Sequence, residues 1–130
     1  MSMTFASARI VTKDVRALAG FYERITAIAP VFGSDEFAEI RTPSGTLAIS
    51  SLRSSDRNGA GAATPGSNRS MVVEFIVEDV DKKRARLASI VKDFVLEPTN
   101  QPWGNRSMLF RDPDGNLINF YKPLPRPAAA

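Results

Sequence analysis

The chain has 130 residues and a mass of 14.2 kDa, which is the length of one domain. Hydrophobic residues make up 43% of it and charged residues 24%, as in an ordinary globular protein, and its 17 Lys and Arg residues exceed its 14 Asp and Glu residues only slightly, for a net charge of +3. The absence of histidine and cysteine excludes a disulfide framework, a zinc ribbon, a thiol nucleophile and the usual ligands of a catalytic metal.

The first half of the chain predicts a strand, a helix and further strands. Asp14 stands at an N-cap position, where its carboxylate can accept from the free N–H groups of the next turn. Pro30 and Gly33 close the connection that follows this helix. The predicted elements are strands at 7–12, 37–41 and 46–50, an amphipathic helix at about 14–26, and a Pro–Gly turn at 42–45.

Residues 52–70 differ in character from the segments on either side. Small and polar residues dominate and show no periodicity, so the segment is predicted to be a linker that is flexible at least in part. A loop of this length can also act as a lid over a site, and that alternative stays open.

The second half predicts the same kinds of element in the same order. Asp79 repeats the capping role of Asp14 and opens a helix that runs to about Ile90. The tail after Lys122 holds three prolines and three alanines and is predicted to be flexible. Strands are predicted at 71–77, 94–97, 107–110 and 117–121, so the repeating unit is a strand, a helix and then three strands.

The chain also repeats its own sequence. Residues 41–49 reappear as residues 111–119, with Arg, Pro, Gly and Leu in the same places, at an offset of 70 (111 − 41). Near the start of each copy, residues 11–15 are similar to residues 76–80, at an offset of 65 (76 − 11). Two copies of one unit imply a pseudo-symmetric fold. The predicted organisation is a single domain over 1–125, with a first module at about 5–51, a linker at 52–70, a second module at about 71–122 and a flexible tail at 123–130.

Charge and hydropathy point to a protein of the cytoplasm that binds neither membrane nor nucleic acid. No apolar run approaches the length of a membrane span, and the N-terminus lacks a basic region followed by an apolar core. The densest basic run, at 82–86, lies in a predicted helix and has no aromatic residues among its charges. Because nucleic-acid surfaces combine basic and stacking residues, this run is interpreted as a solvated helix face.

Together these patterns resemble the vicinal oxygen chelate superfamily, the group of glyoxalases, bleomycin-resistance proteins and extradiol dioxygenases. The resemblance covers nearly all of residues 5–122, and it implies an α+β fold of two tandem βαβββ modules that form an open, U-shaped mixed-sheet pocket, in a homodimer. Its motifs are Asp14-Val15 with Phe21-Tyr22-Glu23, Val77-Glu78-Asp79-Val80-Asp81, Gln101-Pro102-Trp103-Gly104-Asn105-Arg106 and, most specific, Phe110-Arg111-Asp112-Pro113-Asp114-Gly115-Asn116-Leu117-Ile118.

The resemblance also implies where a metal would be held. Metal-dependent members of the family place one ligand on the first strand and one on the last strand of each module, usually His, Glu or Gln. Matching the motifs puts these positions at Ser7, Ile49, Val72 and Asn119. None of these side chains is an imidazole or a carboxylate, so the resemblance implies a member without the family's metal and without another cofactor. A shift of one residue is no better, because it leads to Ala8, Ala48, Val73 and Ile118.

If the ligand positions face the pocket, the residues that alternate with them along each strand face it too. Arg9 and Glu74 are equivalent by the repeat (74 − 9 = 65) and form a predicted charged pair on the inner face. The pair is either a structural ion pair or a device that orients a ligand. Glu74 is the candidate general base on that surface, and no catalytic role is otherwise assigned. The predicted core residues on the opposite face are Ile10, Val73, Phe75, Val77, Ile118 and Phe120.

Trp103 is the only tryptophan and lies in a Pro–Gly loop beside Arg106. Its ring either stacks on a planar or cationic ligand or plugs the open barrel. Met108 and Phe110 alternate with Arg106 and predict a mixed apolar and basic wall. Similar Trp-Gly segments line the drug pocket in bleomycin-resistance relatives. The full set of predicted ligand-binding residues is Ser7, Arg9, Ile49, Val72, Glu74, Trp103, Arg106, Met108, Phe110, Asn119 and Tyr121.

Three functions are compatible with these residues. The first is a metal-independent binder of a small neutral or anionic molecule, for example a drug or metabolite that it sequesters, since the chain is slightly basic. The second is an enzyme: a metal-free isomerase or lyase that uses Glu74, or a lyase or dioxygenase-like enzyme with an unconventional metal site such as Glu39, Glu74 and Asn119. The third is a partner-binding scaffold with a filled pocket.

Overall fold

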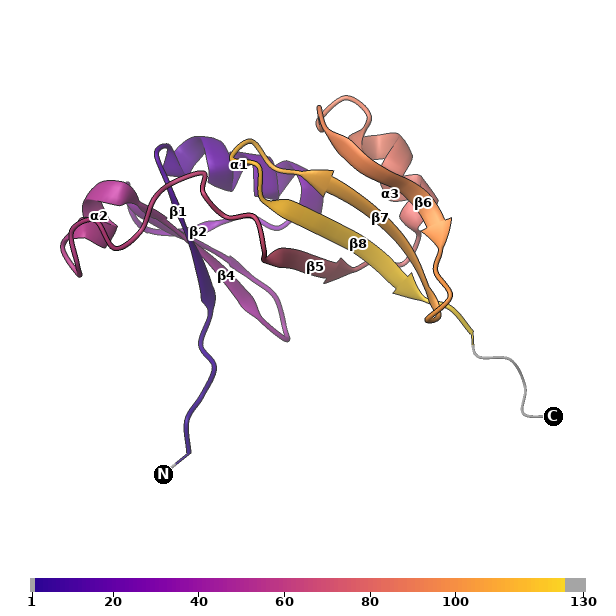
Figure 1. The fold of residues 1–130 in the computed structure, drawn as a ribbon, viewed down its shortest axis with the longest axis horizontal. Helices are drawn as coiled ribbons and strands as arrows, with labels where there is room; N and C mark the ends of the chain where they lie inside the picture. The colour runs from indigo at the N-terminus through magenta and orange to yellow at the C-terminus, as the bar shows by residue number, and fades with distance from the viewer. Residues whose placement is uncertain (1, 126–130) are drawn as a thin grey trace. The chain divides into compact units, whose positions relative to one another are not determined.

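The computed structural model describes residues 2–125, and the chain divides into two units between Ser67 and Asn68. Each unit contains one four-stranded mixed sheet with a helix packed on one of its faces (Figure 1). The order of elements in each sheet-forming module is strand, helix and then three strands. The predicted α+β fold of two tandem βαβββ modules is therefore confirmed.

Unit 1 has the sheet order β1-β4-β3-β2, in which β1 runs parallel to β4 and the other neighbours are antiparallel. Its second strand was predicted only as a connection around Pro30 and Gly33. All four residues of that strand are exposed, so they show no alternation, and pairing with β3 makes the segment a strand. The elements are β1 (Ala8–Thr12), α1 (Val15–Thr26), β2 (Val31–Ser34), β3 (Phe37–Arg41), β4 (Thr46–Ser51) and α2 (Leu52–Asp56).

The helix α1 follows the predicted boundaries. The Asp14 carboxylate accepts from the backbone N–H of Ala17 at 3.0 Å. The helix ends at Thr26, and the next residue, Ala27, caps it in a left-handed conformation with φ of 60°. Its apolar stripe is buried with the alternate residues of β3 and β4. The core of this unit contains Val15, Leu18, Ala19, Phe21, Tyr22, Ile25, Ala38, Ile40, Leu47 and Ile49.

Unit 2 has the sheet order β5-β8-β7-β6, with β5 parallel to β8. Asp79 caps its helix by accepting from the backbone N–H of Lys82 at 3.0 Å, as predicted. The helix ends at Leu87, earlier than the predicted Ile90, because the N–H of Ile90 turns back to the Leu87 carbonyl. The elements are β5 (Val72–Ile76), α3 (Val80–Leu87), β6 (Phe94–Asn100), β7 (Asn105–Arg111) and β8 (Leu117–Pro123).

Two segments predicted to be irregular contain structure. The linker begins with α2, because the Ser51 hydroxyl accepts from the N–H of Ser54 at 3.0 Å and caps this short helix. In the predicted tail, Pro123 belongs to β8 and the N–H of Leu124 donates to the Gly104 carbonyl at 2.8 Å. Residues 126–130 of the predicted tail lie outside the described residues. Among residues 2–125, no helix is long and apolar enough to cross a membrane.

Candidate functional site

The sheet of unit 2 has one face covered by α3 and one face that no helix of residues 68–125 covers, which we call the open face. On the covered face, Phe110 and Phe120 pack edge to face with ring centroids 5.1 Å apart. The predicted core positions Ile118 and Phe120 are buried there, as expected. Because side chains alternate along a strand, the open face contains Val72, Glu74, Ile76, Leu117, Asn119, Tyr121, Pro123, Asn105, Ser107, Leu109 and Arg111.

A hydrogen-bonded pair lies in the middle row of the open face. Glu74 and Asn119 are direct neighbours in the β5–β8 register, and the Asn119 side-chain amide donates to Glu74 Oε2 at 2.8 Å. Because a carboxylate only accepts hydrogen bonds, the Asn119 atom that faces Glu74 is the amide nitrogen, Nδ2. The Asn119 Oδ1 atom is buried and has no hydrogen-bond partner among residues 2–125. The two β5 neighbours of Glu74 on this face, Val72 and Ile76, are 42% and 67% exposed.

The pair therefore sets one carboxylate in a mostly apolar, partly exposed surface. Glu74 itself is exposed, and Tyr121 beside it is half-buried. Such a surface offers apolar contact area with one polar anchor, the usual composition of a small-molecule site.

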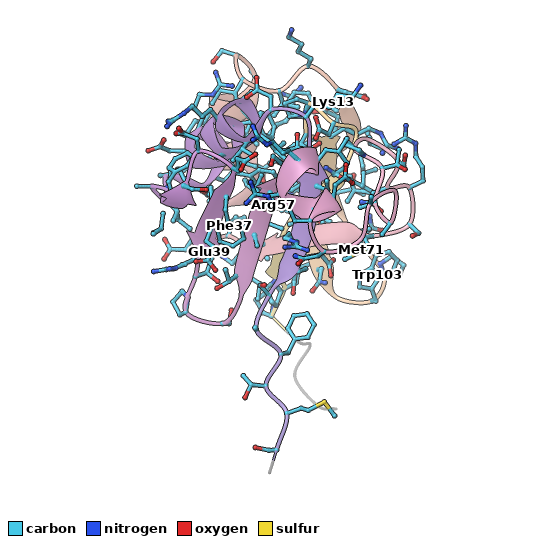
Figure 2. All side chains as sticks on the ribbon, turned by 90° about the vertical axis from the view of Figure 1, so that its left-hand side faces the viewer. Lys13, Phe37, Glu39, Arg57, Met71 and Trp103 are labelled. Carbon is cyan, nitrogen blue, oxygen red and sulfur yellow. The ribbon has the colours of Figure 1, made fainter. Side chains whose placement is uncertain are left out.

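The equivalent face of unit 1 has different polar groups. Arg9 is exposed and lies opposite Ala48 in the β1–β4 register. Phe37 and Glu39 project from the same face of β3 (Figure 2). The Glu39 carboxylate accepts from Arg41 Nη2 at 2.7 Å and from Arg41 Nε at 3.2 Å. Its charge is thus already compensated by a neighbour on the same strand.

The strand register corrects the position assigned to Ile49. Glu74 pairs with Asn119, whereas its repeat equivalent Arg9 pairs with Ala48. Ile49 lies one residue further, on the face covered by α1, and is 0% exposed. The cause is the turn, which spans residues 42–45 in unit 1 but residues 112–116 in unit 2. This extra residue shifts the repeat by one after the turn, so Ala48 is the counterpart of Asn119.

The structure also corrects the face assigned to Arg106, Met108 and Phe110. The three residues do share one face, but it is the one covered by α3, because Met108 pairs with Phe120 and Phe110 with Ile118. Met108 and Phe110 are both 0% exposed. They form part of the core of unit 2 and not of its open face.

Arg106 joins the sheet to the helix. Its Nε and Nη2 atoms donate to the two oxygens of Asp81 on α3, each at 2.8 Å, and its Nη1 atom donates to Asn100 at 3.0 Å. The two-pronged bond from Arg106 holds the pKa of the Asp81 carboxyl below its ordinary value of 3.8. The Arg106 guanidinium therefore makes its hydrogen bonds to side chains of its own unit, Asp81 and Asn100.

Replacing Arg106 by glutamine is expected to raise the pKa of Asp81 towards 3.8, which an NMR titration of the side-chain carboxyl measures. Since the folded state lowers this pKa, the stabilisation is present above 3.8 and is lost as pH falls through the folded-state pKa. Arg84→Gln is the matched control, because Arg84 pairs with Glu97 instead. An unchanged Asp81 titration in Arg106→Gln would contradict this account.

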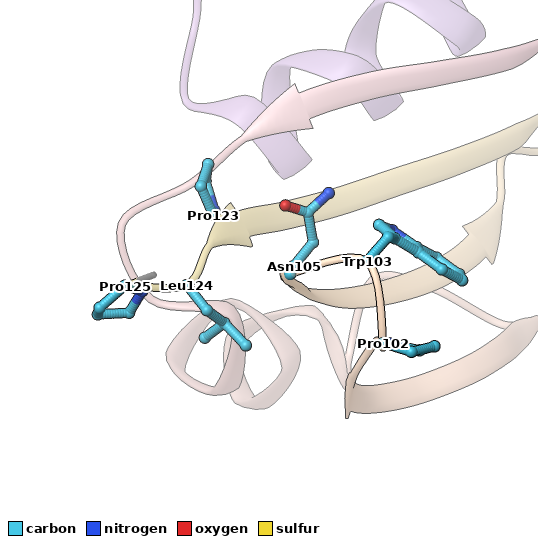
Figure 3. Close-up of a pocket in the computed structure, with 7 residues that line it drawn as sticks. Pro102, Trp103, Asn105, Pro123, Leu124 and Pro125 are labelled. Atoms are coloured by element: carbon cyan, nitrogen blue, oxygen red, sulfur yellow. The ribbon is translucent and has the colours of Figure 1, made fainter. Parts of the chain in front are cut away.

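A pocket of about 350 Å³ lies in unit 2 at the end of the β7–β8 hairpin (Figure 3). Trp103 is 71% exposed beside it, so the indole is not packed as a plug. The turn that carries Trp103 is closed by Gly104, whose φ of 103° suits glycine and whose carbonyl accepts from Leu124. The lining residues are Pro102, Trp103, Gly104, Asn105, Pro123, Leu124 and Pro125.

The residues at the family's metal positions do not form a metal site of that kind. Val72 and Ala48 have no donor atoms, and Ser7 contributes at most a hydroxyl. Asn119 uses its amide to bind Glu74. Within residues 2–125, no three His, Cys, Asp or Glu side chains are grouped so that they could hold a metal ion. A divalent cation requires several nitrogen, sulfur or oxygen ligands, and this donor set does not supply them.

The sequence analysis missed part of the pocket wall and one residue of the open face. Pro123 and Leu124 were interpreted as tail, although Pro123 continues the alternation of Asn119 and Tyr121 along β8. Leu109 was also missed, and its pairing with Asn119 places it beside the polar pair. Alternation extended past the predicted end of the last strand would have found Pro123. Leu109 lies inside the predicted strand 107–110 and was missed because the opposite face of that strand, with Met108 and Phe110, was assigned to the site.

Comparisons with known proteins agree with this architecture. A family model described as the Glyoxalase/Bleomycin resistance protein/Dioxygenase superfamily matches residues 4–120. A protein of unknown function from Agrobacterium tumefaciens str. C58 superposes with a TM-score of 0.81 at 24% identity, over 95% of this chain and 97% of that one. A glyoxalase/bleomycin resistance protein/dioxygenase family enzyme from Burkholderia phytofirmans PsJN superposes with a TM-score of 0.81 at 17% identity, over 92% of this chain and 98% of that one. No protein of curated function matches this chain in sequence.

Proposed function

This chain belongs to the glyoxalase/bleomycin resistance protein/dioxygenase superfamily, and on that premise we propose that it binds a small molecule without the help of a metal ion. The supporting observation is the open face of unit 2, a partly exposed apolar surface with the Glu74–Asn119 pair in its middle row. Apolar walls with few polar anchors are typical of ligand sites. Sequestration of a drug or a metabolite is one form that this function takes.

The charge near the site restricts the class of ligand more than the net charge of the chain does. A net charge of +3 favours neutral or anionic ligands in general. In the middle row of the open face, however, the charged group is the Glu74 carboxylate, and an anion placed beside it would be repelled. Arg111, in the row of Leu117, donates to the Gly115 carbonyl and lies 3.8 Å from Asp93. We therefore propose a ligand that is neutral where it meets Glu74.

N-phenyl-1-naphthylamine, a neutral apolar dye that brightens in apolar surroundings, tests the proposal. We expect a saturable rise in its fluorescence with the native protein, unchanged by EDTA. Ile76→Glu is expected to weaken dye binding at least about tenfold, because it places a charge in the middle of the apolar surface. Ile76 is 67% exposed, so the substitution leaves the core intact.

Met3→Glu is the matched control. It makes the same change from an apolar to an acidic residue at a fully exposed position in unit 1. Dye binding that is absent in the native protein, or that Ile76→Glu and Met3→Glu weaken equally, would contradict the proposed function. Binding that EDTA abolishes and Zn²⁺ or Mn²⁺ restores would contradict its metal independence.

A further inference from the structure

Two residues that line the Trp103 pocket, Asn105 and Pro123, are paired strand residues that alternate onto the same face of the sheet as the Glu74–Asn119 pair. The β7–β8 register runs without interruption from Arg111 opposite Leu117 to Asn105 opposite Pro123. Because side chains alternate, every second pair projects from the open face. From the polar pair towards the pocket, these pairs are Leu109 with Asn119, Ser107 with Tyr121, and Asn105 with Pro123.

This register fixes the separation of the two features. Asn119 and Pro123 are four residues apart on one strand, and a strand rises about 3.4 Å per residue, so the pocket begins about 14 Å from the polar pair. The row between them contains Tyr121 and, next to it on β5, the exposed Ile76. The surface is therefore a track with a carboxylate near one end, an apolar middle and a pocket at the other end.

The two ends differ in the chemistry that they recognise. Figure 3 shows Trp103 and Pro102 on one side of the pocket and Pro123, Leu124 and Pro125 on the other, and an exposed indole offers a flat apolar surface that favours a planar ring. Near the other end, Glu74 has one carboxylate oxygen bound to Asn119. A carboxylate can only accept, so it recognises a neutral group that donates, such as a hydroxyl or an amide.

We propose that the ligand is an elongated molecule with a planar apolar ring at one end and a hydrogen-bond donor at the other. The ring stacks on Trp103, the apolar middle covers Ile76 and Tyr121, and the donor reaches Glu74. This inference rests on the proposed function, since it describes the ligand of the same face.

A series of phenylalkanols, from benzyl alcohol to 8-phenyloctanol, tests the length and the polarity of this track. Trp103 is the only tryptophan, so the intrinsic fluorescence of the native protein reports directly on the pocket. We expect affinity, measured by displacement of N-phenyl-1-naphthylamine, to rise with chain length until the molecule spans the track. Only the long members should both displace the dye and shift the Trp103 emission. The matching phenylalkanoic acids are expected to bind at least about tenfold more weakly, because their carboxylate meets Glu74.

Glu74→Gln provides the decisive variant. It keeps the size of the side chain at an exposed position and removes the charge, so we expect it to abolish the preference for alcohols over acids while Trp103 still responds. Dye displacement without a Trp103 response, or with equal affinity for alcohols and acids in the native protein, would overturn this inference and leave the proposed function standing. Failure of the dye itself to bind would overturn both.

Discussion

Replacing Phe110 by alanine is expected to lower the free energy of unfolding by about 3–5 kcal/mol, the usual cost of removing a buried aromatic side chain. Phe110 is 0% exposed and packs against Phe120 with ring centroids 5.1 Å apart and against Phe94 at 6.2 Å. The alanine would leave a cavity under α3 that the sheet cannot close. Urea denaturation followed by circular dichroism and by the fluorescence of Trp103 measures the loss.

This experiment also separates two roles for Phe110, core residue and ligand contact. Phe110→Leu keeps most of the apolar volume and should cost clearly less than Phe110→Ala. If the leucine variant is folded, we expect it to bind N-phenyl-1-naphthylamine as the native protein does. A stable Phe110→Ala protein that has lost dye binding would instead support the ligand-binding role that sequence reasoning assigned to this residue.

The second large effect is expected at Asp112, which organises the turn between β7 and β8. Asp112 is 5% exposed, and its Oδ1 accepts from the backbone N–H groups of Asp114 and Asn116, both at 2.9 Å. Its Oδ2 accepts from the Asn116 side-chain amide at 2.8 Å. Asp112→Ala leaves these donors unpaired in a buried place, so we expect a loss of about 3 kcal/mol in the free energy of unfolding.

The effect should extend to the start of unit 2. Asn116 accepts through Oδ1 from the Asn68 side-chain amide at 3.0 Å, and Asn68 in turn accepts from the N–H groups of Ser70 and Met71. Hydrogen exchange at Ser70 and Met71 is therefore expected to quicken in Asp112→Ala, beyond what the global loss of stability explains.

The corresponding turn of unit 1 supplies the control for Asp112. Thr42 there forms two exposed hydrogen bonds with Gly45, so Thr42→Ala should cost about 1 kcal/mol or less. Denaturant unfolding of the two variants side by side gives the comparison. Equal losses at Thr42 and Asp112 would show that burial of the carboxylate is not what makes the second turn important.

Local signals in the sequence predicted most of the elements correctly. Asp14 and Asp79 both cap helices, since a short side chain at the N-cap acts on its own next turn and needs no distant partner. Alternation along 117–121 put Ile118 and Phe120 on one face, and the family resemblance assigned that face to the core, where both residues are buried. The strand β2 and the helix α2 were missed, because an exposed edge strand and a one-turn helix leave little periodicity to detect.

The sequence by itself determined the two repeats, the helix caps and the sets of residues that share a face, because these depend on neighbours along the chain. For β7, only the tertiary structure decided which set faces the helix. Arg106, Met108 and Phe110 do share a face, but pairing with β8 turns it towards α3. Likewise, one extra residue in the second turn makes Ala48, and not Ile49, the counterpart of Asn119. Since side chains alternate with a period of two, a shift of one residue between distant strands reverses every assignment that follows it.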